Sequence, residues 1–295
     1  KYNWYIVGNG ATGQVLAYML QNAGYSVCML THKIQSSPIT LQYQREDQEP
    51  KQWNCPTLCY LDNPDITIDK LIVTTKAHSA QTAVNQWQHK MNPSTRVYFW
   101  QNGIGFINEA KLQQPYFYVV NSGIASFKTG QNTVIHTALC DVFIGSKQHP
   151  QHNADIEQLQ QAGIHCLWKN DIDTYRWLKV AINSIINPLS VIYQCKNGEL
   201  INIPTAIEQI NSLANECARV FSQHGIVHSA SDIYNITRTV IDNTQNNISS
   251  MLQDYKKGSK KSEIAFINDQ IIQLALAAQH AVPVPTHTAL SKKIK

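Results

Sequence analysis

Residues 2–20 contain the pattern that most restricts what this chain of 295 residues can fold into. A run of apolar and aromatic residues at 2–7 predicts a buried strand, and apolar residues at helical spacing after residue 13 predict a helix. Between them lies GNGATG, residues 8–13. A lone GxGxxG is weak, and an ordinary glycine-rich turn is the alternative, but the flanking strand and helix make it informative. We therefore expect the first strand–turn–helix unit of a parallel α/β sheet.

The three glycines of this turn have separate physical roles. Gly8 permits the tight turn, Gly10 lets the backbone approach a pyrophosphate, and Gly13 lets the helix pack closely on the strand. The first amide groups of the helix and the positive end of its dipole then suit a phosphate. The predicted cofactor-binding residues of the turn are Gly8, Asn9, Gly10, Ala11, Thr12 and Gly13.

The second predicted strand, residues 25–30, ends in Thr31, His32 and Lys33. A site specific for NAD usually carries Asp or Glu about 20 residues after the glycines, where it holds the ribose 2′-hydroxyl. Here no carboxylate repels a 2′-phosphate, and a cation is available. We therefore predict that Thr31, His32 and Lys33 bind the cofactor and favour its 2′-phosphorylated form.

The remainder of the first half alternates strands with helices. Residues 44–54 are predicted to be a polar loop. Lys76 and Asn102 follow two predicted strands at the carboxyl ends where open α/β sheets bind ligands. An ordinary surface lysine and an Asn-Gly turn are the alternatives at these two positions. The predicted strands are 39–43, 71–75, 96–100, 117–120, 133–138 and 141–144, and the predicted helices are 79–91 and 155–162.

A polar stripe marks the predicted helix at 176–190, most of which is apolar. Lys179, Asn183 and Asn187 recur every four residues, so they share one narrow face. Unpaired buried polar groups cost free energy, so this face must find partners or border a wet cleft. A solvated helix face is the alternative. The stripe favours a substrate-binding surface with an ammonium proton donor and two amides.

From residue 172 onward the pattern becomes nearly continuous helix, with predicted helices at 205–223, 231–242, 249–257 and 263–280. Such a change in composition argues for a second domain. The predicted fold class is α/β: an N-terminal Rossmann-like dinucleotide-binding domain at 1–170 and an all-helical substrate and catalytic domain at 171–295.

Composition excludes several other classes of protein. The net charge of +4 is small and its lysine clusters are typical of solvated surface, which argues against nucleic-acid binding. Seven cysteines form no paired zinc pattern, and eleven histidines form no metal motif, so we expect no metal. No apolar run is long enough for a membrane span. Reduced thiols and the lack of a leader pattern predict a cytoplasmic protein.

Four motifs resemble those of the ketopantoate reductase (2-dehydropantoate 2-reductase) family, in the family's order and over nearly the whole chain. They are GNGATG at 8–13; VTTKA at 73–77 with QNGIG at 101–105; WLKVAINSIINPL from residue 177 with NGEL at 197–200; and NNISSMLQD at 246–254 with SEIAFIN at 262–268. The last two are long and specific.

The resemblance implies that NADPH reduces the ketone of 2-dehydropantoate to (R)-pantoate, on the route to pantothenate and coenzyme A, in a cleft between the domains. It implies Lys179 as proton donor and Glu263 as an essential glutamate that also touches the cofactor. On the cofactor side it implies Lys76 and Asn102, the latter also facing substrate. The remaining substrate contacts that it implies are Asn183, Asn187, Asn197, Asn247 and Ser250.

The chain departs from the family pattern at two places. His32 stands where several relatives carry an arginine for the 2′-phosphate, and one extra residue lies around Gly258. Asn197 also suits a plain helix-ending Asn-Gly pair. The alternative functions are a related dehydrogenase of another 2-keto or 3-hydroxy acid, and an NADP-binding sensor without turnover. The expected assembly is a monomer or a homodimer.

Overall fold

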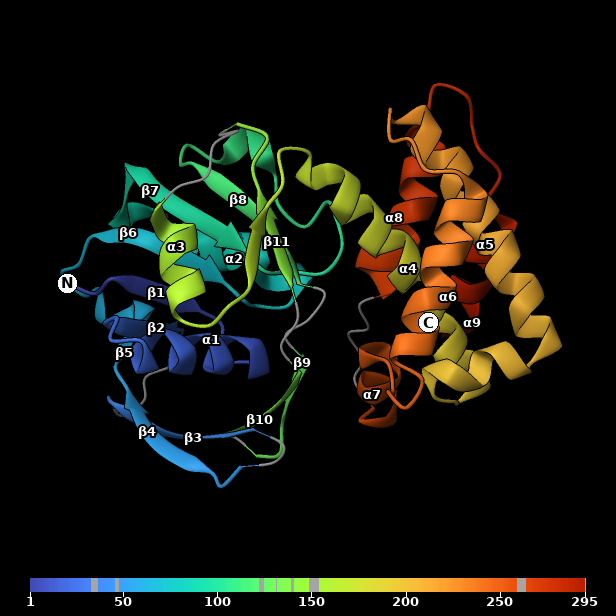
Figure 1. The fold of residues 1–295 in the computed structure, drawn as a ribbon. Helices are drawn as coiled ribbons and strands as arrows, with labels where there is room; N and C mark the ends of the chain where they lie inside the picture. Colours follow the sequence, from blue (N-terminus) through green and yellow to red (C-terminus); the bar gives the residue numbers. More distant parts are fainter. Residues whose placement is uncertain are drawn as a thin grey trace. The chain divides into compact units, whose positions relative to one another are not determined.

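A computed structural model describes residues 1–32, 37–45, 48–121, 125–130, 132–138, 141–148, 154–258 and 264–294. The chain divides into two compact units (Figure 1). The first contains Lys1–Gln101 and Phe106–Ile172, and the second contains Asn102–Gly105 and Asp173–Lys295. Each unit has its own hydrophobic core.

The first unit is built on an eight-stranded sheet of order β12-β11-β8-β7-β6-β1-β2-β5. All neighbouring strands run parallel except β8 and β11, which are antiparallel. The strands are β1 (Trp4–Val7), β2 (Val27–Thr31), β5 (Thr57–Cys59), β6 (Ile68–Val73), β7 (Met91–Phe99), β8 (Tyr116–Asn121), β11 (Val142–Gly145) and β12 (Cys166–Trp168). The helices of this unit are α1 (Ala11–Asn22), α2 (Ala77–Trp87) and α3 (Ala154–Gln161), with single 3-10 turns η1 (Tyr60–Asp62), η2 (Gln88–Lys90) and η3 (Glu109–Lys111).

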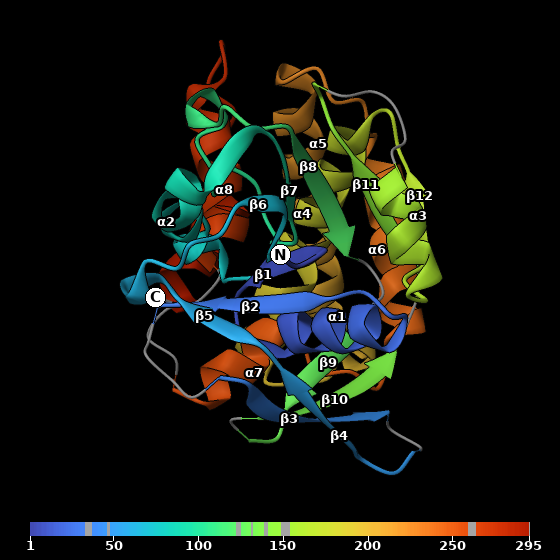
Figure 2. The same ribbon diagram turned by 90° about the vertical axis from the view of Figure 1, so that its left-hand side faces the viewer.

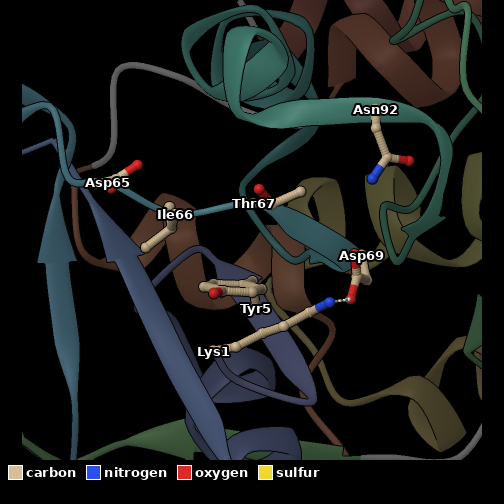
Figure 3. Close-up of a pocket in the computed structure, with 7 residues that line it drawn as sticks. All are labelled: Lys1, Tyr5, Asp65, Ile66, Thr67, Asp69 and Asn92. Atoms are coloured by element: carbon tan, nitrogen blue, oxygen red, sulfur yellow. Dashed lines mark ion pairs between the residues drawn. The ribbon is translucent and has the colours of Figure 1, made fainter.

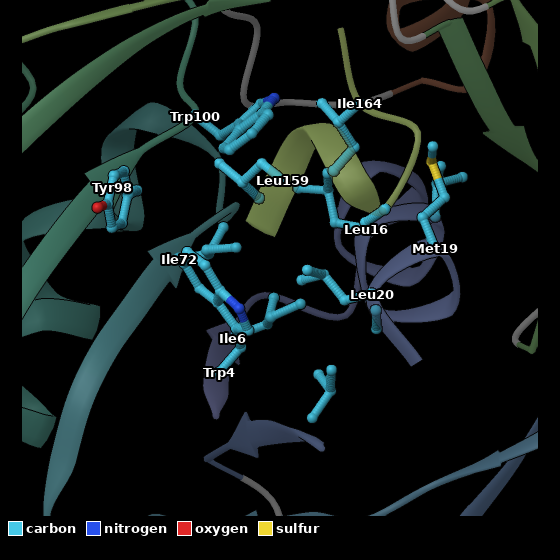
Figure 4. Packing of buried hydrophobic residues seen from close by; sticks show 14 of the residues in the cluster. Trp4, Ile6, Leu16, Met19, Leu20, Ile72, Tyr98, Trp100, Leu159 and Ile164 are labelled. Carbon is cyan, nitrogen blue, oxygen red and sulfur yellow. The ribbon is translucent and has the colours of Figure 1, made fainter. Parts of the chain in front are cut away.

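Side chains from the sheet, α1 and α3 form the core of this unit (Figure 4). Trp4 and Ile6 point into the cluster, where they meet Leu16 and Leu20 of α1 and Leu159 of α3. Alternate residues of a strand face opposite sides of a sheet. Tyr5 and Val7, which are also buried, therefore face the other side of the sheet. Burial on both faces explains why these strands read as continuous apolar runs.

A second, four-stranded sheet of order β4-β3-β10-β9 lies on the far side of α1 (Figures 1 and 2). Helix α1 contacts β1 and β2 of the large sheet and β3, β9 and β10 of the small one. Tyr18 of α1 stacks on Tyr43 of β3, with ring centroids 3.8 Å apart. The strands of the small sheet are β3 (Ile39–Arg45), β4 (Lys51–Cys55), β9 (Ala125–Lys128) and β10 (Thr133–Ala138).

The polar loop predicted at 44–54 is wrong, because this stretch holds the end of β3 and most of β4. Strand β4 is an edge strand that pairs with β3, and Lys51, Gln52 and Asn54 are exposed. Its side chains therefore carry no apolar alternation that the sequence could reveal. The helix predicted at 79–91 also ends earlier, at Trp87, and the 3-10 turn η2 separates it from β7, which begins at Met91.

The second unit is helical, with α4 at the centre of its core. Side chains such as Ala181, Ile185 and Leu189 are fully buried, and α4 is apolar over most of its circumference. Neighbouring helices begin at favourable caps: Pro204 opens α5, Ser229 caps α6 and Ser249 caps α7. The elements are α4 (Ile172–Tyr193), η4 (Asn197–Asn202), α5 (Pro204–Gln223), α6 (Ala230–Asn243), α7 (Ser250–Lys256), α8 (Ile264–Ala277) and α9 (Pro285–Ile294).

The predicted fold class is confirmed, since a unit with a largely parallel sheet is followed by a helical unit. No helix among the residues described here is both long enough and apolar enough to cross a lipid bilayer.

Candidate active site

The glycine turn after β1 admits no side chain at two of its positions. Gly8 has φ +119°, and a Cβ there would lie 2.6 Å from Thr74 Oγ1 and 2.7 Å from the backbone nitrogen of Thr75. A Cβ on Gly13 would lie 2.1 Å from the Gly8 oxygen. These approaches seat α1 directly on the turn and beside the end of β6. The roles predicted for Gly8 and Gly13 therefore have a steric basis in the structure.

Gly10 leaves the start of α1 open. It is the N-cap residue, it provides no side-chain cap, and nothing lies within 4 Å of the position a Cβ would take. The first turn of α1 contains no acidic residue. The N–H groups of the first helical residues, Ala11, Thr12 and Gly13, have no intrahelical acceptor. This uncapped end fits a phosphate-containing ligand such as a dinucleotide.

The other predicted cofactor residues of the first unit lie after neighbouring strands. Thr31 ends β2, is half-buried, and is followed by the exposed His32. Lys76 is exposed and forms the N-cap of α2 just after β6. Strands β2, β1 and β6 are parallel neighbours, so these residues share one edge of the sheet with the glycine turn. Lys33 lies outside the described residues.

Gln101, for which the sequence predicted no role, joins two strand ends at this edge. Its Nε2 donates hydrogen bonds to the backbone oxygens of Val73, at 2.9 Å, and Thr75, at 3.0 Å. It thereby holds the end of β7 against the end of β6. Asn102, the next residue, is exposed. The buried Gln101 thus fixes the chain just before Asn102. A glutamine at this position is not a recognised sequence signal for such an anchor.

The polar stripe of α4 is present as predicted from its spacing. Asn187 is buried, and Lys179 and Asn183 are partly exposed. The Lys179 ammonium has no hydrogen-bond or ion-pair partner within the described part of the chain. It is crowded by protein although the residue keeps some exposed surface, and this desolvation lowers its pKa from the ordinary 10.5. An ammonium placed in this way on an apolar helix can stabilise negative charge that develops on a bound substrate.

The lower part of this stripe is shaped by a proline inside the helix. Pro188 has no N–H, so the Ser184 carbonyl loses its normal helical donor. The Asn268 side chain of α8 replaces it, with Nδ2 3.0 Å from the Ser184 oxygen. Asn268 is fully buried. The sequence reading missed Asn268, although a proline within a helical pattern signals a carbonyl in need of a donor.

Helix α7 is fastened to α4 through a pair of serines. Ser190 Oγ and Ser249 Oγ lie 2.6 Å apart, and Ser249 also accepts a hydrogen bond from the Leu252 N–H. Ser249 is buried, whereas Ser250, the predicted substrate residue, is exposed at the first position of α7. The buried serine therefore positions the helix and leaves its neighbour available.

Asn197 connects η4 to the loop before α7. Its side-chain Nδ2 donates to Thr244 Oγ1 at 2.9 Å, and its backbone N–H donates to the Asn247 oxygen at 3.0 Å. Asn197 is 7% exposed, and its Oδ1 is buried and accepts no hydrogen bond from the described residues. Asn247 itself is exposed. Asn197 begins η4 rather than ending a helix. Its Oδ1 remains an unused acceptor among the described residues.

Within residues 173–294, the predicted residues that the structure describes lie on α4, on η4 and at the start of α7, and the Ser190–Ser249 contact joins α4 to α7. Glu263 lies outside the described residues. No group of three metal-ligating side chains occurs within the described ranges.

A pocket with a volume of about 360 Å³ lies near the amino ends of β1, β6 and β7 (Figure 3). Its lining includes Thr67, just before β6, and Asn92, at the start of β7, and Lys1 pairs with Asp69 across it at 2.6 Å. The glycine turn is at the opposite ends of these parallel strands. This pocket is therefore separate from the predicted dinucleotide site.

Comparison with known families covers both units. The family model described as "Ketopantoate reductase PanE/ApbA" matches residues 4–149, and "Ketopantoate reductase PanE/ApbA C terminal" matches residues 171–295. The 2-dehydropantoate 2-reductase of Escherichia coli O157:H7 is 35% identical over 239 residues, covering 79% of this chain and 76% of that protein. The 2-dehydropantoate 2-reductase of Vibrio cholerae serotype O1 is 27% identical over 99% of this chain and 97% of its own.

Solved structures share the fold at lower identity. D-mandelate dehydrogenase with NADH and anilino(oxo)acetate has a TM-score of 0.87 at 19% identity, covering 99% of this chain and 96% of the other. The PanE/ApbA family ketopantoate reductase from Ralstonia eutropha JMP134 has a TM-score of 0.85 at 21% identity, covering 99% and 97%. Structural similarity at this level of identity establishes the fold. The substrate has to be argued from the residues of the site.

Proposed function

Because the chain belongs to the ketopantoate reductase family, we propose that it reduces 2-dehydropantoate with the α4 stripe as its catalytic and substrate-binding surface. The oxidoreductase activity, from 2-dehydropantoate to (R)-pantoate, follows from the family and from the names of its relatives. The roles of the individual residues are the proposed part. The observation that carries them is Lys179 on α4, whose ammonium has no partner among the described residues, with Asn183 and Asn187 at successive four-residue steps.

Lys179 is the proposed proton donor. NADPH supplies the hydride when it is bound, and hydride addition leaves negative charge on the ketone oxygen. A protonated lysine stabilises this charge and then donates its proton. Desolvation lowers the pKa of Lys179, which makes the proton easier to give up. Glu263 is proposed to keep Lys179 charged and to direct it toward the substrate, and also to contact the cofactor.

Neutral amides and a hydroxyl are proposed to recognise the remainder of the substrate. Each asparagine offers both donors and acceptors, which suits hydroxyl and carbonyl groups. The Oδ1 of Asn197, which has no partner in the described ranges, supports its inclusion with Asn183 and Asn187. Ser250 is proposed to bind the substrate carboxylate, with Asn247 beside it, since both are exposed near the start of α7.

The cofactor cradle is proposed to combine the glycine turn with the ends of three strands. Thr31, His32 and Lys33 bind the 2′-phosphate, and Lys76 and Asn102 lie toward the nicotinamide side. No carboxylate follows β2 at 31–33 to repel a phosphate. We expect about tenfold higher catalytic efficiency with NADPH than with NADH, equivalent to roughly 1.4 kcal/mol. Equal efficiencies, or an unchanged ratio in a His32→Ala, Lys33→Ala variant, would contradict this assignment.

The decisive assay follows nicotinamide absorbance while the purified chain turns over 2-dehydropantoate with NADPH. The structural likeness to D-mandelate dehydrogenase makes an aryl 2-keto acid the appropriate competing substrate. We expect the highest catalytic efficiency with 2-dehydropantoate. Preference for another keto acid would favour the related-dehydrogenase function, and cofactor binding without turnover of any keto acid would favour a sensor.

The proposed setting is the cytoplasm, and the proposed assembly is a monomer or a homodimer. The six cysteines of the described residues are free, which suits a reducing compartment. A ketopantoate reductase from Staphylococcus aureus with the same fold is described as dimeric. Light scattering on the purified chain gives the assembly directly.

A further inference from the structure

Lys128, the last residue of β9, reaches the glycine turn from the small sheet. Its Nζ donates a hydrogen bond to the backbone oxygen of Asn9 at 3.3 Å, across 119 residues of sequence. Asn9 directly precedes Gly10, the N-cap of α1. The contacts of α1 with β9 and β10 hold the strand in place. The small sheet therefore places the Lys128 ammonium beside the N-terminus of α1.

The positive charge of Lys128 has no counter-charge in the described part of the chain, where the Asn9 oxygen is its hydrogen-bond partner. Burial lowers the pKa of Lys128, and no acid among the residues that the structure describes offsets this effect. The N-terminus of α1 is also positive, and its first turn contains no acidic residue. Two adjacent positive features in a partly desolvated place are unfavourable unless an anion joins them.

We propose that Lys128 binds the diphosphate of the nicotinamide dinucleotide, together with the N–H groups at the start of α1. This inference rests on the proposed use of such a cofactor by the chain. A diphosphate compensates both positive features at once, and its oxygens accept the two ammonium hydrogens that Asn9 leaves unused. The four-stranded sheet thus takes part in cofactor binding through β9.

The diphosphate, rather than the 2′-phosphate, is the group that Lys128 contacts. Lys128 approaches the turn after β1, beside the helix terminus that suits a diphosphate. The residues proposed for the 2′-phosphate follow a different strand, β2, at Thr31 and His32. Because NADPH and NADH share the diphosphate, loss of the Lys128 charge must weaken both cofactors by the same factor.

The test measures dissociation constants for NADPH, NADH and 2′-AMP by isothermal titration calorimetry. Lys128→Gln keeps an amide donor for Asn9 and removes the charge. We expect this variant to bind NADPH and NADH each about tenfold more weakly, or roughly 1.4 kcal/mol. Binding of 2′-AMP, which has no diphosphate, stays unchanged. Lys128→Arg, which keeps the charge, binds both dinucleotides within a few-fold of the wild type.

Lys51→Gln is the matched control, because Lys51 is an exposed lysine on β4, the opposite edge strand of the same sheet. It should leave all three constants unchanged. Wild-type affinity of Lys128→Gln for both dinucleotides would overturn the inference, as would weakening of NADPH alone or a Lys128→Arg variant as weak as Lys128→Gln. A wild-type chain that binds neither dinucleotide would instead contradict the proposed function.

Discussion

At the scale of single residues, the proposed chemistry depends on the charge of one lysine. Lys179→Ala should lower kcat by roughly 100-fold or more, the scale of general acid catalysis. The dissociation constant of NADPH should not change, because the glycine turn lies in the other unit. Steady-state kinetics and cofactor titration measure the two effects. Lys257→Ala, at an exposed lysine of the same unit, is the control, and a Lys179→Ala enzyme with over half the wild-type rate would exclude Lys179 as proton donor.

The same residue predicts a pH dependence. Desolvation lowers the pKa of Lys179 from 10.5, and only its protonated form donates a proton. Activity is therefore retained below the lowered pKa and is lost as pH rises through it. We expect kcat/KM, which reports the free enzyme, to fall at alkaline pH with an apparent pKa below 10.5. Lys179→Arg stays charged, so its residual activity should lack this alkaline fall; an unchanged profile in that variant would assign the titration elsewhere.

At the scale of elements, the proline of α4 and the asparagine of α8 should act as a unit. Asn268→Leu leaves the Ser184 carbonyl buried without a donor, at a cost of about 1–3 kcal/mol. In a Pro188→Ala background the helix regains its own N–H donor, so the same substitution should cost less. Urea unfolding of the four proteins in this double-mutant cycle measures the coupling. Equal costs in the two backgrounds would show that Asn268 does not substitute for the missing N–H.

A buried ion pair fastens α9 to α5 and α4. His287 Nδ1 lies 2.7 Å from Glu216 Oε2, and its Nε2 lies 3.2 Å from Ser184 Oγ. The Ser184 hydroxyl donates to the Ala181 oxygen, so it accepts from Nε2. Both ring nitrogens of His287 therefore donate, and the imidazole is positively charged. Glu216 and His287 are at most 3% exposed, so the pair is shielded from solvent.

This pair predicts how stability depends on pH. Burial opposes the charge of His287, but Cys217 and Glu216 outweigh it and raise its pKa from 6.5 to about 9. Burial likewise opposes the charge of Glu216, but hydrogen bonds from His287 and Thr286 lower its pKa from 4.5 to about 2. The histidine contribution is complete below 6.5 and is lost as pH rises through 9. The glutamate contribution is complete above 4.5 and is lost as pH falls toward 2.

Substitution of the histidine tests this dependence. His287→Asn should lower the free energy of unfolding by about 3–5 kcal/mol near neutral pH, because it leaves a buried carboxylate uncompensated. It should also remove the loss of stability between pH 6.5 and 9. A Glu216→Gln, His287→Asn double variant, which has no buried charge, should recover part of the stability. An alkaline loss that persists in His287→Asn would mean that another group titrates.

At the scale of the whole molecule, we predict that substitutions in the proposed substrate surface of the second unit leave cofactor binding unchanged. Asn183→Ala, Asn187→Ala and Ser250→Ala should each raise KM for 2-dehydropantoate, with roughly 1–3 kcal/mol per lost contact. The dissociation constant of NADPH should stay at the wild-type value in all three. Glu263→Ala should both weaken the binding of 2-dehydropantoate and lower kcat. If all three single variants saturate like the wild type, the substrate binds elsewhere.

Much of this molecule was predictable because its signals are local. The strand, glycine turn and helix at the start follow from apolar runs and from backbone conformations that only glycine tolerates, as Gly8 with φ +119° shows. The stripe of Lys179, Asn183 and Asn187 follows from helical periodicity alone. The short or polar strands gave no such signal, and β4 was predicted to be a loop because pairing with β3, rather than its own side chains, makes it a strand.

The sequence by itself determined the alternating strands and helices of the first half, the helical second half, the glycine turn, the family and the spacing of the candidate residues, because these depend on neighbours within a few positions. Only the tertiary structure decided which distant groups complete them. Asn268 serves a carbonyl 84 residues earlier, His287 pairs with a glutamate 71 residues earlier, and Lys128 meets a turn 119 residues earlier. Buried polar groups and charges need partners, and the folded core brings these partners from distant parts of the chain. A local sequence pattern does not reveal such long-range pairs.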